Sequence, residues 1–129
     1  MQVRMPYAQG TVSAELRDVH PLDTLDIAEV PALENIRAAA LKSFESPIGM
    51  TGNVFSGYGK ADQVLILVSD SFRTTRMEQV LPVLLEGLSS KSVPDENINF
   101  LFATGTHRPP TKEEQARILG NEVYQRFEP

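Results

Sequence analysis

Gln63-Val64-Leu65-Ile66-Leu67-Val68 is the stretch that decides the fold class of this 129-residue chain. A short, continuous run of branched apolar residues is typical of a strand buried on both faces, as in a parallel sheet. A second such run, Ile98 to Ala103, follows a segment, Thr74 to Ser90, in which apolar residues recur every three or four positions. Strand, helix and strand of this length predict a βαβ unit. We therefore expect an α/β protein with an open, mostly parallel sheet flanked by helices.

The segments around this unit carry their own turn and capping signals. Val3 to Tyr7 and Thr11 to Leu16 are short alternating runs that predict an N-terminal β-hairpin. Pro31 to Glu45 has apolar residues at helical spacing and predicts an amphipathic helix. Thr111 to Glu114 forms a capping box that begins the last helix, and Gly120 is a natural stop for it.

Composition and charge argue against several classes of function. The chain has no cysteine, which excludes disulfides and thiolate sites and is compatible with the cytoplasm, where we expect the protein. A net charge of −5 argues against general binding to nucleic acid or to a membrane surface. Met1 to Gly10 has no signal-peptide core, and no apolar run is long enough to span a bilayer. No spacing of histidines or carboxylates predicts a metal site in this chain.

Two polar loops, Ser69 to Arg73 and Thr104 to Arg108, directly follow the two predicted strands. Open α/β sheets bind ligands beyond the carboxyl ends of their strands. If the strands are parallel, Asp70 and Arg73 emerge at the same sheet edge as His107. The two loops are therefore predicted to form one wall of an active site.

Each candidate side chain in these loops has a structural alternative. Asp70 suits either a cap of the following helix or a partner for a ligand hydroxyl, and its position does not separate the two. Arg73 is either a solvated side chain in the first helical turn or a fork that binds a carboxylate or phosphate. A cation is unfavourable at that helix end, which favours a nearby anion. His107 is either a structural loop residue or a proton donor and acceptor, and its predicted place opposite Asp70 and Arg73 favours the second role. His20 has no suitable polar neighbours and is expected at the surface.

The two loop motifs, Ser69 to Arg73 and Ala103 to Pro109, resemble those of the lactate racemase family, whose members use a nickel-pincer nucleotide cofactor. The flanking stretches that also resemble this family are Val3 to Tyr7, Ala39 to Gly49, Leu81 to Leu85 and Thr111 to Glu114. The resemblance thus covers essentially the whole chain. Members of the family are considerably longer and have two α/β domains with the cofactor between them. The resemblance implies that residues 1–129 are a single α/β domain, the N-terminal part of a longer two-domain enzyme.

The resemblance also implies an activity: inversion of a 2-hydroxy acid by hydride transfer to the nickel-pincer nucleotide. His107 matches one of two proton-transfer bases of the family, and Arg73 matches an arginine that faces the substrate carboxylate, so both are predicted to be catalytic. The second base, the lysine that tethers the cofactor and the nickel-ligating histidine belong to later parts of the family's chain. The resemblance therefore implies that this chain is inactive without its C-terminal domain.

The resemblance further implies which residues bind the ligands. Asp70, Ser71, Phe72 and Arg73 match a segment that contacts the cofactor, and Arg73, Thr106 and His107 are expected at the substrate. The chain departs from the family at Phe72, where threonine is usual, and at the following Thr74, where proline is usual, so the identity of the 2-hydroxy acid stays open. An alternative from another class is a non-catalytic nucleotide-binding or carboxylate-binding module, and a third is a purely structural domain.

Overall fold

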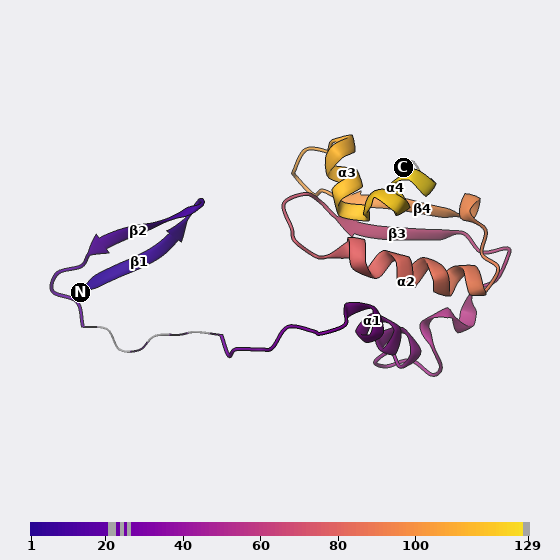
Figure 1. The fold of residues 1–129 in the computed structure, drawn as a ribbon, viewed down its shortest axis with the longest axis horizontal. Coiled ribbons are helices and arrows are strands. Elements are labelled where there is room, and N and C mark those ends of the chain that lie inside the picture. Colours follow the sequence, from indigo (N-terminus) through magenta and orange to yellow (C-terminus); the bar gives the residue numbers. More distant parts are fainter. Residues whose placement is uncertain (21–22, 24, 26, 128–129) are drawn as a thin grey trace. The chain divides into compact units, whose positions relative to one another are not determined.

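The computed structural model describes residues 1–20, 23, 25 and 27–127, which fall into two compact units, Met1–Ala32 and Leu33–Pro129 (Figure 1). The first unit is the predicted β-hairpin. Strands β1 (Gln2–Tyr7) and β2 (Gly10–Glu15) pair antiparallel, and Ala8 in the connecting turn has a positive φ of 51°. Paired residues share a face, so the register gathers most of the apolar side chains on one face of the hairpin and most of the polar ones on the other.

The second unit is built on the predicted βαβ unit. Strands β3 (Val64–Ser69) and β4 (Ile98–Ala103) pair in parallel, in a register that runs from Val64 opposite Ile98 to Ser69 opposite Ala103. Helix α2 (Met77–Ser90) connects them and lies alongside β3 (Figure 1). The predicted α/β class with a parallel strand pair is therefore confirmed.

The other helices and turns of the second unit pack around the β3–α2–β4 motif. They are α1 (Ile36–Glu45), α3 (Lys112–Leu119), α4 (Asn121–Phe127) and the short 3-10 turns Val54–Gly57 and Asp95–Asn97. The core joins the inward side chains of β3 to one stripe of α2 and to the C-terminal helices. Its buried residues are Phe55, Val64, Ile66, Val68, Leu81, Leu85, Leu88, Val93, Ile98, Ile118, Leu119 and Val123.

Two predictions about the extent of burial and of helix need correction. The strands were expected to be buried on both faces, yet Leu65, Leu67 and Leu101 are 54%, 62% and 50% exposed. Within the described residues the core covers only one sheet face, which a continuous apolar run does not reveal. Helix α1 begins at Ile36 rather than Pro31, because Asn35 caps it by accepting a hydrogen bond from the backbone of Ala38 at 2.9 Å.

The sequence signals predicted the ends of α3 correctly but not the start of α2. The capping box at Thr111 is confirmed, and Gly120, with a positive φ of 84°, ends α3 as predicted. Helix α2 starts at Met77, three residues after the predicted Thr74, and Pro82 lies inside it. Arg76 precedes α2 in the left-handed conformation, with a φ of 56°. This left-handed residue ends the loop after β3, so that the loop does not continue the helix.

Replacing Gly87 with alanine is expected to destabilise the second unit. Gly87 lies in α2 directly against the Phe55 ring, and an added Cβ would overlap that ring. Overpacking of this kind costs about 1–3 kcal/mol, more than the helix propensity that alanine contributes. Thermal unfolding should show a lower Tm for Gly87→Ala and little change for Gly57→Ala, where the added Cβ meets nothing within 4 Å. An unchanged or raised Tm for Gly87→Ala would contradict this packing.

Candidate active site

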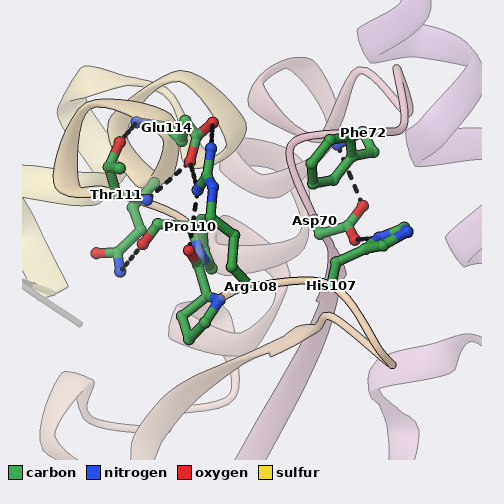
Figure 2. A network of polar contacts seen from close by, with 9 residues as sticks. Asp70, Phe72, His107, Arg108, Pro110, Thr111 and Glu114 are labelled. Carbon is green, nitrogen blue, oxygen red and sulfur yellow. Dashed lines mark hydrogen bonds and ion pairs between the residues drawn. The ribbon is translucent and has the colours of Figure 1, made fainter.

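The loops that follow β3 and β4 leave the same end of the parallel pair, because Ser69 lies opposite Ala103. They bring together two residues that are 37 positions apart in the chain. The Nδ1 atom of His107 lies 2.5 Å from Oδ2 of Asp70 (Figure 2). The predicted meeting of the two loops is therefore confirmed, with Asp70 and His107 in direct contact.

Asp70 is held by its own loop as well as by His107. The backbone N–H of Phe72 donates to Oδ1 of Asp70 at 3.2 Å, and the N–H of Arg73 donates to its carbonyl oxygen at 3.4 Å. Asp70 is only 2% exposed. Helix α2 begins at Met77 and has no side-chain cap, so Asp70 does not cap it. The carboxylate instead uses both oxygens inside the site.

The electrostatics of the pair define the role of each atom. The hydrogen bond from His107 lowers the pKa of Asp70 below its ordinary value, and the Phe72 N–H and the charges of His107 and Arg73 act in the same direction, against the effect of burial. Asp70 is therefore ionised at neutral pH and can only accept. We infer that Nδ1 of His107 donates to Asp70, so that in the neutral imidazole Nε2 is the acceptor. The His107 side chain is 46% exposed, so Nε2 belongs to an accessible imidazole.

An aromatic ring lies against this pair. The Phe72 ring is tilted by 50° to the imidazole of His107, with 4.5 Å between ring centroids. The guanidinium carbon of Arg108 lies 6.0 Å from the centroid of Phe72. Phe72 is nevertheless 62% exposed, so one part of the ring packs on the site and the rest faces outward.

Glu114 connects both loops to helix α3. Its carboxylate accepts two hydrogen bonds from Arg108, at 2.7 and 2.8 Å, and a third from the backbone N–H of Thr111 at 2.8 Å (Figure 2). The hydrogen bonds from Arg108, the Thr111 N–H and the Ser71 hydroxyl lower the pKa of Glu114 to about 2, and those from Arg108 have the largest effect. A residue of the predicted capping box thus also anchors the loop after β4, which sequence reasoning did not anticipate.

The ion pair of Glu114 should make stability depend on pH. Because the pKa of Glu114 is about 2 in the folded state and its ordinary value is 4.5, the contribution of its charge to stability is complete above about pH 5 and disappears as pH falls towards 2. We expect Glu114→Gln to lower Tm at pH 7 and the difference from the wild type to shrink at acid pH. Glu113→Gln, also in the first turn of α3, is the matched control and should change Tm little. Equal effects of the two variants would contradict this role.

A cleft of about 380 Å³ is lined by residues of the loop after β3, the start of α2 and the end of α3. Its lining residues are Ser71, Arg73, Thr74, Thr75, Arg76, Met77, Glu78, Arg117 and Ile118. Three of these side chains are guanidinium groups, and the lining residues include a single carboxylate, that of Glu78, 3.9 Å from Arg76. The concentration of positive charge makes the cleft suited to an anion.

The structure places the remaining predicted residues as follows. Arg73 lines the cleft, but it precedes α2 instead of lying in its first turn. Ser71 lines the same cleft and reaches Glu114. Thr106 is exposed in the turn next to His107, where Gly105 has a φ of +57°. Sequence reasoning missed Arg117, because its place in the cleft depends on how α3 packs and has no local signal.

The part of the chain that the structure describes has neither a cluster of metal ligands nor a membrane-spanning helix. Among residues 1–20, 23, 25 and 27–127, no group of three or more histidines, aspartates and glutamates is arranged to hold a metal ion. In the same part of the chain, no helix has the length and apolar character needed to cross a membrane.

Comparison with known proteins gives two matches. Residues 7–129 match the sequence model of the family described as the lactate racemase N-terminal domain. The chain is also 30% identical over 124 residues to the lactate racemase of Lactiplantibacillus plantarum, an alignment that covers 94% of this chain. The chain spans 28% of the length of that relative.

Proposed function

The chain belongs to the family of lactate racemase N-terminal domains, and from this premise we propose that it forms one wall of the active site of a racemase or epimerase of 2-hydroxy acids. In this proposal residues 1–129 act as the N-terminal domain of a longer two-domain enzyme, and the C-terminal domain supplies the opposite wall. The observation that carries the proposal is the Asp70–His107 pair, which has an accessible imidazole and shares the loop after β3 with Ser71 and Arg73 of the arginine-lined cleft.

His107 acts as the base for the substrate hydroxyl. The hydroxyl of the 2-hydroxy acid donates to Nε2, and its proton moves from the oxygen to Nε2 as the α-carbon gives up its hydride and becomes a carbonyl carbon. The imidazole is then a cation that keeps its Nδ1 hydrogen on the Asp70 carboxylate. Asp70 stabilises this cation and remains ionised itself. The proton returns from Nε2 to the same oxygen when the hydroxy acid forms again.

Arg73 binds the substrate carboxylate in this proposal. It comes from the same loop as Asp70, and its charge reaches Asp70 closely enough to lower the pKa of that residue. A guanidinium group can hold a carboxylate through two parallel hydrogen bonds, which fixes the substrate in orientation as well as position. Thr106, next to His107, is the proposed polar neighbour of the substrate hydroxyl.

The cleft fits the anionic part of a nucleotide, and we propose that the nickel-pincer nucleotide binds against it. Ser71 and Arg73 would hold the cofactor from this side, with Asp70 and Phe72 in the same loop. The described residues offer no metal-binding cluster, so the nickel ligands in this proposal belong to the C-terminal domain. When bound, this cofactor would supply the hydride acceptor that inversion at the α-carbon needs.

The test uses the full-length protein, loaded with cofactor, and single enantiomers of lactate and of larger 2-hydroxy acids. Chiral chromatography should show conversion to a racemic mixture or an epimer, and nickel should copurify with the active protein. An acid deuterated at C2 should keep its deuterium in the inverted product in ordinary water, because the hydride returns to the carbon it left. Complete exchange of the deuterium with solvent would contradict hydride transfer.

The isolated 129-residue chain is the control in this experiment. It lacks the opposite wall of the site and should not racemise any of the acids. Binding of nucleotide or hydroxy acid by the full-length protein, without turnover, would favour the non-catalytic module instead. Turnover by the isolated chain would overturn the proposed division of the site between two domains.

A further inference from the structure

Phe72 is the only large apolar residue in the two loops, 70–76 and 104–111, that form the site. It is 62% exposed, although exposure of a phenyl ring to water is unfavourable. Its neighbours in the loops are polar or small, and Phe72 is not among the residues that form the core or are packed against it. The position of this ring therefore calls for an explanation other than burial in the fold.

The ring is held in a fixed place beside the proposed base. The backbone N–H of Phe72 is bonded to Asp70 at 3.2 Å, and the same carboxylate binds His107. The guanidinium carbon of Arg108 lies 6.0 Å from the ring centroid, and Arg108 is itself anchored by Glu114. Phe72 is thus bonded through its backbone to one charged residue and lies near a second, each of which has a partner of its own.

This arrangement places an apolar surface where the substituent of a substrate would lie. A hydroxyl bonded to Nε2 of His107 sits about 3 Å from that atom. The carbon that carries the hydroxyl is one bond further, and the centroid of the Phe72 ring is 4.5 Å from that of the imidazole. A substituent on that carbon that extends towards the loop after β3 would therefore approach Phe72.

We propose that Phe72 determines substrate specificity, by contacting the substituent on the reacting carbon of the 2-hydroxy acid and favouring a bulky apolar or aromatic group over a methyl group. This inference rests on the proposed function and adds the class of substrate. Each methylene accommodated in an apolar pocket changes specificity by about 10-fold to 200-fold, and aromatic groups gain further from ring contacts. A phenyl ring in this place thus favours 2-hydroxy acids such as 3-phenyllactate over lactate.

The test compares full-length wild type, Phe72→Ala and Phe72→Tyr on lactate, 2-hydroxybutyrate, 2-hydroxy-3-methylbutyrate and 3-phenyllactate. We expect the kcat/KM of the wild type to be at least about 10-fold higher for 3-phenyllactate than for lactate. Phe72→Tyr keeps the ring and should keep this ratio. Phe72→Ala should lower the ratio by about 10-fold or more, mainly through a higher KM for 3-phenyllactate. Calorimetric titration with 3-phenyllactate should show the same loss of binding in Phe72→Ala.

Three results would contradict the specificity inference, and they show whether the proposed function fails with it. If wild type racemises none of the acids, the proposed function is wrong and the specificity inference falls with it. If wild type is active and Phe72→Ala slows all four acids equally, the ring only supports His107 and the inference alone is overturned. A wild type that prefers lactate over 3-phenyllactate would also overturn it.

Discussion

His107→Asn in the full-length protein is expected to reduce kcat/KM for racemisation by about 10²-fold to 10⁴-fold, the range typical for loss of a general base. Asparagine places an amide N–H close to where Nδ1 stood, so it can still donate to Oδ2 of Asp70. It has no group that reaches the place of Nε2. The variant therefore separates the hydrogen bond that holds the site together from the atom that takes the proton.

His107→Ala provides the comparison. It also removes the base, but it leaves an oxygen of the buried Asp70 carboxylate without its partner, which is destabilising. We expect both variants to lose activity to a similar extent and only His107→Ala to show an appreciably lower Tm. His20→Asn, at an exposed position, should match the wild type in rate and stability. Activity of His107→Asn within a few-fold of the wild type would exclude His107 as the base.

The fold was predictable where a local signal was sufficient. The continuous apolar runs at Val64 to Val68 and Ile98 to Ala103 predicted two strands, and the capping box at Thr111 predicted the start of α3. Hydrophobic runs and caps act over a few residues and are visible in sequence. The extent of sheet burial was not predictable, because the exposure of Leu67 depends on which elements cover the sheet.

The candidate site, like the fold, was predictable from the sequence only in part. Two polar loops after parallel strands must meet at one sheet edge, so the meeting of Asp70 and His107 followed from topology. The choice between a helix cap and a site partner for Asp70 did not, since it depended on where α2 begins. The left-handed backbone at Arg76 delays that start and leaves Asp70 free of the helix. The anchoring of Arg108 by Glu114 joins a loop to a helix and had no signal in either alone.

Asp70→Asn is expected to lower kcat by about 10²-fold to 10⁴-fold while KM stays within a few-fold of the wild type. The amide has nearly the same shape, but its NH₂ group can donate where the carboxylate only accepted. An amide that donates to Nδ1 favours the imidazole tautomer with hydrogen on Nε2, and that tautomer cannot take a proton from the substrate. The loss therefore falls on the chemical step and leaves the binding of the carboxylate by Arg73 intact.

Stability against pH gives this prediction a second readout. The pKa of Asp70 is lowered in the folded protein, so its charge contributes stability above its ordinary value, and this contribution is lost as pH falls through the lowered value. The difference in Tm between the wild type and Asp70→Asn should accordingly be larger at pH 7 than in strong acid. Asp95→Asn is the matched control, because Asp95 also has a lowered pKa through its pair with Arg126 but lies before the start of β4, at the opposite end of the strand. Asp95→Asn should show the same trend in Tm and leave kcat unchanged. If both variants lowered kcat equally, the effect of Asp70→Asn would reflect general destabilisation, and Asp70 would have no positioning role towards His107.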